Sequence, residues 1–378
     1  MKIAYVMASH VPSKNANSVH VMKMCQSMAK LGHDVTLFSI FVNGISESGV
    51  SDVYSYYGVD KCFNIESIKF SKQTKFTPYL FAVKAISKVI KLKPDLVYLR
   101  GVTSAFVLML RSGIPFVLES HSPVLRSRKK LNVFMMRKLL MAKQFLRLVV
   151  ITNVLKEFYL KDASFPKDKI PVVLADGADQ VPDWLSVDRI RNGNGCLQIG
   201  YFGHLYKGRG IDIIIETARQ MSHCDFHIVG GKEKDIEYWQ KEAEDVKNLM
   251  FHGYITPGEV YKYRNSCDIL LAPYQEKVYV AGGHYQESSA YMSPLKVFEY
   301  MASKKAIICS DMPVLREVLN DENAILVKAD DTDIWVEAIA RLEDETLRQK
   351  LSNEAYADFM ERYTWDTRAE LAVKGLFV

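Results

Sequence analysis

The chain has 378 residues, a length that suits two domains of ordinary size. With 48% hydrophobic and 25% charged residues, 20 glycines and 12 prolines, its composition excludes a disordered or fibrous protein. The net charge of +5 is unevenly spread: residues 1–185 hold 26 Lys and Arg against 13 Asp and Glu, whereas residues 186–378 hold 23 against 31. The basic half indicates an anionic partner, either a membrane surface or nucleic acid, or else only a solvated basic face.

The first half of the sequence alternates between strands and helices. Short β-rich runs and apolar residues at helical spacing predict, in chain order, strand 3–8, helix 19–31, strand 35–41, helix 79–91, strand 96–99, helix 104–112, strand 116–119, a long basic helical stretch, strand 148–151 and a short helix from residue 153. Such alternation is typical of a parallel sheet with both faces covered by helices.

The most basic segment is 120–156, which has nine Lys and Arg and no acidic residue. Over 126–147 the basic residues are interleaved with apolar ones, namely Leu131, Val133, Phe134, Leu139 and Leu140. This pattern predicts an amphipathic surface helix for anionic lipid. We do not expect nucleic acid as a partner, because no binding module for it is recognisable.

The six cysteines are scattered, with no CxxC pair and no neighbouring histidine cluster. A reducing cytosol is therefore expected, and a disulfide framework or zinc module is not. The longest apolar stretch, 96–110, is interrupted by Arg100 and is too short to cross a bilayer. The first twelve residues, MKIAYVMASHVP, indicate a first buried strand and not a signal peptide.

A break in the pattern lies near residues 176–195, where ADGADQVPDW and RIRNGNG collect turn residues. We place the domain boundary there, between residues 185 and 186. The alternation then restarts with strand 197–202, helix 211–221, strand 225–229, helix 235–246, strand 249–252, helix 258–265, strand 269–272, helix 294–303, strand 306–310 and a helical tail. The predicted fold class is α/β, with two facing Rossmann-like, doubly wound domains and a ligand in the cleft between them.

The first segment that indicates chemistry is YFGHLYKGRGID, residues 201–212. It leaves a predicted strand, passes Gly203, Gly208 and Gly210, and enters a helix, so backbone N–H groups can approach a phosphate. It is neither the dinucleotide pattern GxGxxG nor a P-loop. Lys207 and Arg209 would lie at the positive end of the helix dipole, which favours a bound anion over a plain strand–helix turn.

The second segment is MSPLKVFEYMA, residues 292–302. Ser293 is predicted to be the helix N-cap, and Pro294 the first helical residue. Lys296 again places a cation in the first turn, three residues before Glu299, and an ion pair between these two is the simpler alternative. Two helix starts with cations predict one shared anion, such as a diphosphate, with Glu299 accepting hydrogen bonds from a ribose diol.

GHLYKGRGID and SPLKVFEYMASKKAIICSDMPVLREVL resemble the donor-site motifs of the GT-B, family 4 glycosyltransferases, which are retaining enzymes that use nucleotide sugars. HVPSKNANSVHVMKMCQSMAKLGHDVTLF resembles the loop, helix and second strand near the start of such enzymes. The resemblance extends over nearly the whole chain. It implies a GT-B fold with an acceptor domain over 1–185, a donor domain over 186–364, and a C-terminal helix, 365–378, that packs back on the first domain.

The resemblance also implies a role for each matching residue. Arg209 and Lys296 would bind the diphosphate as catalytic residues, and His121 in LESHS would lie near the transferred sugar. Glu299 would bind the ribose. The other donor-side residues would be Gly203, His204, Lys207, Tyr254, Ser293, Pro294, Leu295 and Glu317, and the acceptor-side residues Asn15, Asn17 and His20.

Tyr291 departs from the family pattern, because it stands where the first Glu of the E-x7-E motif is usual. The identity of the donor sugar therefore stays open. Asp331 and Asp333 match a DxD string, but they precede a predicted helix over 334–342, so we interpret them as helix capping. Because cations and helix dipoles meet the leaving-group charge, we expect no metal and no cofactor.

The predicted function is transfer of a hexosyl group, with retention, from a nucleotide-diphosphate sugar to a hydroxyl of a glycan or lipid-linked acceptor. We expect a cytoplasmic enzyme at the inner face of the membrane, in cell-surface polysaccharide or glycoconjugate synthesis. Two alternatives stay open: a sugar-nucleotide epimerase of the same fold, and a non-catalytic protein that binds nucleotide sugars.

Overall fold

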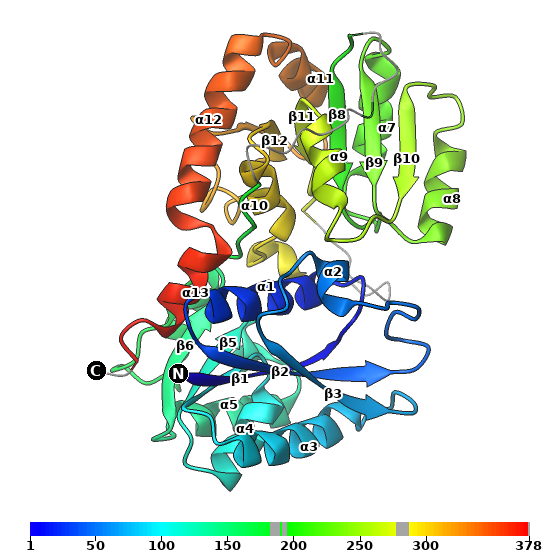
Figure 1. Cartoon of the computed structure of the whole chain (residues 1–378). Helices are drawn as coiled ribbons and strands as arrows, with labels where there is room; N and C mark the ends of the chain where they lie inside the picture. The colour runs from blue at the N-terminus through cyan, green and yellow to red at the C-terminus, as the bar shows by residue number, and fades with distance from the viewer. Residues whose placement is uncertain (182–189, 191–194, 277–286, 377–378) are drawn as a thin grey trace. The chain divides into compact units, whose positions relative to one another are not determined.

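A computed structural model describes residues 1–181, 190, 195–276 and 287–376, and the chain divides into two compact units (Figure 1). The N-terminal unit is Met1–Asp176 together with Trp365–Val378, and the C-terminal unit is Gly177–Thr364. The boundary predicted between residues 185 and 186 lies outside the described residues.

The N-terminal unit is built on a parallel sheet of seven strands in the order β3-β2-β1-β4-β5-β6-β7. The strands are β1 (Lys2–His10), β2 (Asp34–Val42), β3 (Asn64–Phe70), β4 (Leu96–Leu99), β5 (Phe116–Ser120), β6 (Phe145–Val150) and β7 (Val172–Val173). The central strands β4 and β5 are buried at every position, which is why their sequences are nearly continuous apolar runs. The strand order reverses between β1 and β4.

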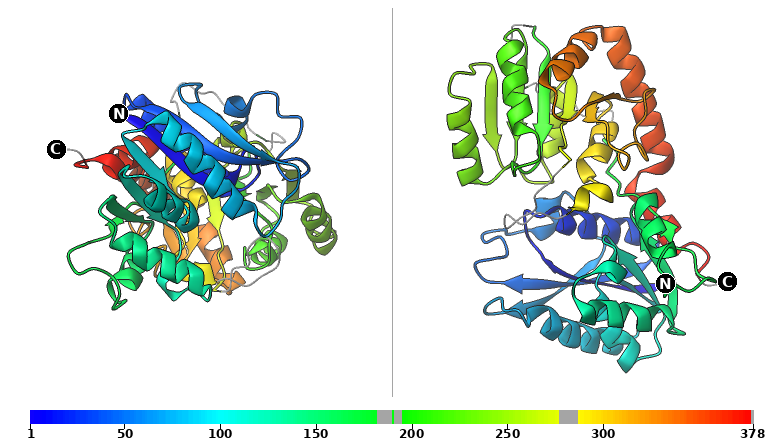
Figure 2. Two further views of the ribbon diagram at one scale, coloured as in Figure 1. Left: turned by 90° about the horizontal axis from the view of Figure 1, so that it is seen from below. Right: turned by 180° about the vertical axis from the view of Figure 1, so that it is seen from behind.

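Helices cover both faces of this sheet, with α3, α4 and α5 side by side on one face and α1 on the other (Figures 1 and 2). The helices are α1 (Ala16–Lys30), α2 (Val53–Tyr57), α3 (Thr77–Leu92), α4 (Val102–Arg111), α5 (Lys130–Leu140), α6 (Asn153–Leu160) and the 3₁₀ turn η1 (Val124–Arg126). From the end of the chain, α13 (Trp365–Val373) packs against α1.

The long basic helix predicted over 126–147 is wrong. The helix α5 spans only Lys130–Leu140, and β6 begins at Phe145. The sequence FLRLVV forms a strand because it fills a place in the sheet beside β5. Leu139 and Leu140 belong to the core of the unit, whereas Leu131 and Phe134 are exposed, so only part of the predicted apolar face meets solvent.

The C-terminal unit repeats the arrangement with six parallel strands in the order β10-β9-β8-β11-β12-β13. They are β8 (Gln198–Phe202), β9 (Asp225–Val229), β10 (Leu249–Gly253), β11 (Ile269–Ala272), β12 (Ala306–Ser310) and β13 (Ile325–Val327). Here the order reverses between β8 and β11. Open α/β sheets bind ligands beyond the carboxyl ends of the strands at such a reversal. A ligand-binding site is therefore expected at the loops that follow β8 and β11.

The helices of the C-terminal unit are α7 (Ile211–Gln220), α8 (Glu233–Glu242), α9 (Val260–Ser266), α10 (Leu295–Ala302), α11 (Thr332–Arg341), α12 (Glu345–Arg362) and the 3₁₀ turn η2 (Glu287–Ala290). In α7, Ile211, Ile214, Ile215 and Ala218 recur at helical spacing and are buried. They join strand residues and Trp335 of α11 in one hydrophobic core. This core fixes α7, and therefore the loop that leads into it.

Of two predicted helix caps, one is wrong and the other is confirmed by its position. Pro294, and not Ser293, is the N-cap of α10, because its ψ of 121° is extended and the helix begins at Leu295. Asp331 is the N-cap of α11 as predicted, but its side chain makes no capping hydrogen bond. In the described part of the chain, no helix combines the length and the apolar character needed to cross a bilayer.

Candidate functional site

Two basic side chains meet in the C-terminal unit where its strand order reverses. Arg209 lies in the loop after β8, and its guanidinium carbon is 5.3 Å from the centre of the Tyr274 ring, which follows β11. Lys296, in the first turn of α10, places its Nζ 5.1 Å from the same ring and 3.7 Å from the Tyr201 ring. The loops are joined by a backbone hydrogen bond from Gln275 N to Gly208 O of 3.1 Å.

These two cations have no salt-bridge partner in the described part of the chain, although the charge of Glu299 acts on Lys296 from a distance. Among the residues described, neither Arg209 nor Lys296 makes a salt bridge, and the buried Nε of Arg209 has no hydrogen-bond partner. Burial and the charge of Arg209 hold the pKa of Lys296 well below its ordinary value. Bringing two like charges together away from water costs free energy unless a bound anion neutralises them. The arrangement is therefore that of an anion site.

Gly203 makes room for this pair. Its φ is +148°, in a region that side chains other than glycine rarely adopt, and a Cβ there would lie 3.0 Å from Lys296 Nζ. The neighbouring His204 stacks on Tyr206, with ring centres 4.9 Å apart. Burial, together with Arg209, Lys296 and Lys232, lowers the pKa of His204 to about 4, so its imidazole is neutral at pH 7. Lys207 is exposed on the same loop.

Glu299 is oriented by another helix. Its Oε2 accepts a hydrogen bond of 3.1 Å from Nη1 of Arg264, in α9. Arg264 is buried, and its Nε also donates to Ser303 Oγ at 3.3 Å. The simple ion pair between Lys296 and Glu299 is thus wrong, because Arg264 holds the carboxylate. The Glu299 side chain is still 27% exposed, so it remains open to a ligand.

The remaining donor-side residues surround these elements. Ser293 and Pro294 precede α10, Leu295 begins it, and all three are half-buried. Tyr254 follows β10 and Glu317 lies in the turns after β12; both are half-buried. Apart from Glu317, each of these positions follows the carboxyl end of a strand or lies at the start of a helix.

In the N-terminal unit, His121 follows β5 and lies against a buried carboxylate. Its Nε2 is 2.5 Å from Glu119 Oε1 and 2.8 Å from Arg100 Nη2. Glu119 is fully buried and also accepts hydrogen bonds from the Tyr98 hydroxyl and, at 3.2 Å, from Arg368 Nη1. The predicted residue His121 is therefore one member of a larger charged network.

Electrostatics set the protonation of this network. Burial alone would raise the pKa of Glu119, but Arg368, His20 and Arg100 overcome it and hold that pKa well below its ordinary value. Burial and Arg100 lower the pKa of His121 to about 4, so the ring is neutral at pH 7. A neutral imidazole that is 30% exposed can donate or accept a hydrogen bond toward a bound hydroxyl.

The predicted acceptor-side residues lie near this network to different degrees. His20 is buried, with Nδ1 2.8 Å from Asp176 Oδ1 and Nε2 3.2 Å from Glu119 Oε1. The carbonyl of Asn17 is 3.5 Å from Arg100 Nη1, and its side chain accepts from Ser9 Oγ. Asn15 is the exposed N-cap of α1, and its side chain makes no capping bond.

Among the residues that the structure describes, two sets of side chains have the spacing to hold a metal ion. His20, His121 and Asp176 offer ligand atoms within 4.8 Å of one another, and so do His223, Cys224 and Glu343. In the first set, Arg368 lies 4.0 Å from the Asp176 carboxylate and already supplies positive charge to it. In the second, burial raises the pKa of the Cys224 thiol to about 12, which disfavours the thiolate that binds metal.

Several residues of these sites are not among the predicted ones. Tyr201 and Tyr274 provide the aromatic faces under the cations, and Tyr274 has a sequence signal, because it follows a predicted strand at its carboxyl end. Arg264 and Arg368 could not have been found, because nothing near them indicates their distant carboxylate partners.

Comparison with known proteins agrees with this architecture. Residues 18–174 match the family "Glycosyltransferase Family 4", and residues 197–345 match "Glycosyl transferases group 1". Soluble starch synthase 1 of Solanum tuberosum is 30% identical over 82 residues, which are 21% of this chain and 13% of that protein. The chain thus spans only a small part of that curated relative.

Solved structures share the fold over the full length. Sucrose-phosphate synthase from Thermosynechococcus elongatus has a TM-score of 0.70 at 16% identity, covering 98% of this chain and 97% of its own. HepE from Anabaena, solved with UDP and glucose, has a TM-score of 0.70 at 13% identity, covering 100% and 99%. A TarM variant from S. aureus, solved with fondaparinux, α-GlcNAc-glycerol and UDP, has a TM-score of 0.70 at 10% identity, covering 99% of each chain.

The two family matches together cover most of the chain, and the protein belongs to the family 4-like glycosyltransferases of the GT-B fold. The predicted fold class, two Rossmann-like α/β units with parallel sheets, is confirmed.

Proposed function

We propose that this glycosyltransferase moves a hexosyl group, with retention, from a nucleotide-diphosphate sugar to a hydroxyl of a glycan or lipid-linked acceptor. The observation that carries the proposal is the pair of cations, Arg209 and Lys296, which lie at one aromatic ring with no salt bridge to any described residue. A diphosphate supplies the missing negative charge. The UDP bound in the HepE and TarM structures supports the same class of donor.

The geometry suggests how the leaving group is stabilised. When the bond between sugar and diphosphate breaks, negative charge grows on the phosphate oxygens, and fixed cations stabilise that state more than the bound donor. Glu299, held by Arg264, is placed to accept from the ribose hydroxyls. His121 is proposed to hydrogen-bond the transferred sugar. We assign no protein nucleophile, and we propose that leaving-group departure needs no metal or other cofactor.

A panel of nucleotide sugars tests the proposal and its two alternatives. Nucleotide release that requires an acceptor hydroxyl supports a transferase, whereas release without any acceptor indicates an epimerase of the same fold. Binding of UDP, GDP or ADP without any turnover indicates a non-catalytic binding protein. The assays are run in excess EDTA, in which we expect full turnover; activity restored only by Mg²⁺ or Mn²⁺ would refute metal independence.

Donor binding is expected to take up a proton at Lys296. In the empty protein the pKa of Lys296 is held below its ordinary value, and a bound diphosphate raises it again, so a proton is expected to be taken up at pH values between the two. The affinity for UDP should therefore fall as pH rises above that lowered pKa. Calorimetry in two buffers of different ionisation enthalpy measures the uptake, which Lys296→Met should remove; equal heats for the unsubstituted protein would contradict it.

We also propose that the enzyme works at the inner face of the cytoplasmic membrane, in cell-surface polysaccharide or glycoconjugate synthesis. The support is the face of the N-terminal unit formed by α3, α4 and α5 (Figure 1). Its exposed apolar side chains are Phe76, Tyr79, Leu80, Val83, Leu110, Leu131 and Phe134. Lysines and arginines alternate with them, which is the pattern of an interfacial membrane surface.

Co-sedimentation with vesicles tests this surface. We expect binding to vesicles that contain phosphatidylglycerol, weaker binding as salt rises, and little binding to phosphatidylcholine alone. The double variant Leu80→Ser, Phe134→Ser should lose most of the binding, whereas Tyr238→Ser, at an exposed residue of the other unit, should not. Equal binding to both kinds of vesicle would contradict the proposal.

A further inference from the structure

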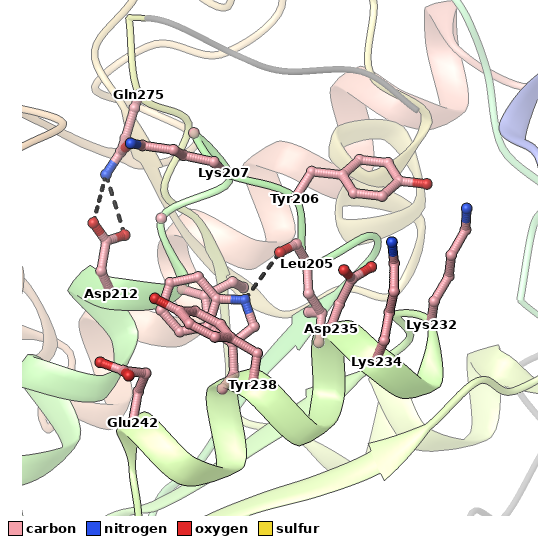
Figure 3. Close-up of a pocket in the computed structure, with 14 residues that line it drawn as sticks. Leu205, Tyr206, Lys207, Asp212, Lys232, Lys234, Asp235, Tyr238, Glu242 and Gln275 are labelled. Carbon is pink, nitrogen blue, oxygen red and sulfur yellow. Dashed lines mark hydrogen bonds between the residues drawn. The ribbon is translucent and has the colours of Figure 1, made fainter. Parts of the chain in front are cut away.

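A pocket of about 840 Å³ lies beside the loop that follows β8 (Figure 3). Its walls are this loop, the start of α7, the helix α8 and Gln275 after β11. The volume is within the range of sites for small molecules. Of the side chains given a donor-side role above, Lys207 is the one that lines this pocket.

The pocket is distinct from the cation pair, although the two share a loop. Neither Arg209 nor Lys296 lines it. The loop is fixed on the pocket side by Trp239, whose Nε1 donates a 3.0 Å hydrogen bond to Leu205 O, as Figure 3 shows. Arg209 instead lies against Tyr274, which does not line the pocket either. A ligand of the pocket therefore need not contact the diphosphate.

The charges in the pocket wall balance. Three lysines, Lys207, Lys232 and Lys234, are matched by three carboxylates, Asp212, Asp235 and Glu242. An anion bound there, in addition to the diphosphate, would be repelled by the three carboxylates, and a cation would be repelled by the three ammonium groups. An uncharged molecule with many hydroxyls can instead accept from the lysines and donate to the carboxylates.

Aromatic faces and one unsatisfied oxygen favour the same class of ligand. Tyr206, Tyr238 and Trp239 line the pocket, and Tyr238 is 56% exposed, so its ring is free to pack against a ligand. Oδ2 of Asp235 is buried, with no hydrogen-bond partner among the described residues. Such an atom is costly unless a donor reaches it. Gln275 donates to both oxygens of Asp212 at 3.1 Å and still has its carbonyl oxygen as an acceptor.

We infer that this pocket is a second binding site, separate from the diphosphate site, for an uncharged saccharide. The sugar ring packs on Tyr238, its hydroxyls donate to Asp235 and Glu242, and the lysines donate to its oxygens. The site would hold carbohydrate on the donor-side unit whether or not nucleotide is bound.

Titration of the full chain with maltotetraose, chitotetraose and xylotetraose, followed by saturation-transfer NMR, tests the inference. At least one should bind with a Kd on the order of 1 mM or tighter. Tyr238→Ala should weaken that binding about tenfold, as expected for loss of an aromatic contact, and Asp235→Asn should also weaken it. Tyr79→Ala, at an exposed tyrosine of α3, is the matched control and should leave binding unchanged.

Competition with nucleotide separates this site from the proposed donor site. Saccharide binding should persist in saturating UDP and in Arg209→Ala, and UDP affinity should be unchanged in Tyr238→Ala. Displacement of the saccharide by UDP, binding unaffected by both pocket variants, or no binding of any of the three saccharides would overturn the inference. If the protein binds saccharide but no nucleotide, the inference stands and the proposed donor is wrong.

Discussion

Arg209→Ala and Lys296→Ala are each expected to cut turnover at saturating donor by about 10²–10³, the usual effect of removing one preorganised electrostatic contact. Both side chains lie at the Tyr274 ring with no acidic partner in the described structure, so their charge is available to the leaving diphosphate. The effect should fall on kcat, because the charge on the phosphate oxygens grows as the bond breaks.

A measurement of thermal stability distinguishes a variant that has lost catalysis from one that has lost its fold. In the empty protein the two cations repel each other, so neither substitution should lower the thermal midpoint much, and either one relieves repulsion. Lys350→Ala, at an exposed lysine of α12, is the matched control and should change neither turnover nor stability. Near-normal turnover in both folded variants would show that the anion site is elsewhere.

Replacing Arg368 by methionine should lower the free energy of unfolding by about 3–5 kcal/mol, the usual cost of breaking a buried ion pair by removing one partner. Glu119 is fully buried, and Arg368 is the largest of the charges that lower its pKa. Methionine fills a similar volume but leaves the carboxylate less compensated. Urea unfolding at pH 7 measures the difference.

Two companion variants make this test specific. Arg362→Met breaks an exposed i,i+4 pair with Asp358 in α12 and should cost no more than about 1 kcal/mol. Adding Glu119→Gln to Arg368→Met should recover part of the loss, because the buried carboxylate that lost its Arg368 partner is then replaced by a neutral amide. A cost for Arg368→Met no larger than that for Arg362→Met would show that Arg368 does not stabilise the buried carboxylate.

The difference in stability between the unsubstituted protein and Arg368→Met should also depend on pH. A carboxyl whose pKa is lowered in the folded state contributes stability above its unfolded pKa and loses it as pH falls through the folded pKa. Glu119 is such a group. The gap between the unsubstituted protein and Arg368→Met should therefore be widest near neutral pH and shrink in acid, where Glu119 is protonated in both.

Most of the sheet could be predicted from the sequence, because central parallel strands are continuous apolar runs of limited length. Strands 96–99, 225–229, 269–272 and 306–310 match the structure at both ends. β7 and β13, of two and three residues, are too short to leave a pattern. β3 was missed because NIESIKF is half-buried and polar in composition.

In the candidate site, too, residues with a local sequence signal could be predicted and residues defined by distant contacts could not. Arg209 and Lys296 could be predicted because each lies at a helix start next to glycine or proline, and such local signals need no knowledge of the fold. The partners that orient the site could not be predicted. Arg368 contacts Glu119 across 249 residues of sequence, and Arg264 reaches Glu299 from a different helix, so only the folded structure shows these pairs.

The place of α13 has a consequence for how the protein is made. The helix belongs to the N-terminal unit, yet a ribosome synthesises it only after the whole span Gly177–Thr364. At about 5–20 residues per second, that delay is on the order of 10–40 s. During this time the nascent N-terminal unit holds the Glu119 carboxylate without Arg368 and leaves the α13-facing side of α1 uncovered. The N-terminal unit, although it begins the chain, can therefore complete its fold only after the whole span of the C-terminal unit has been synthesised.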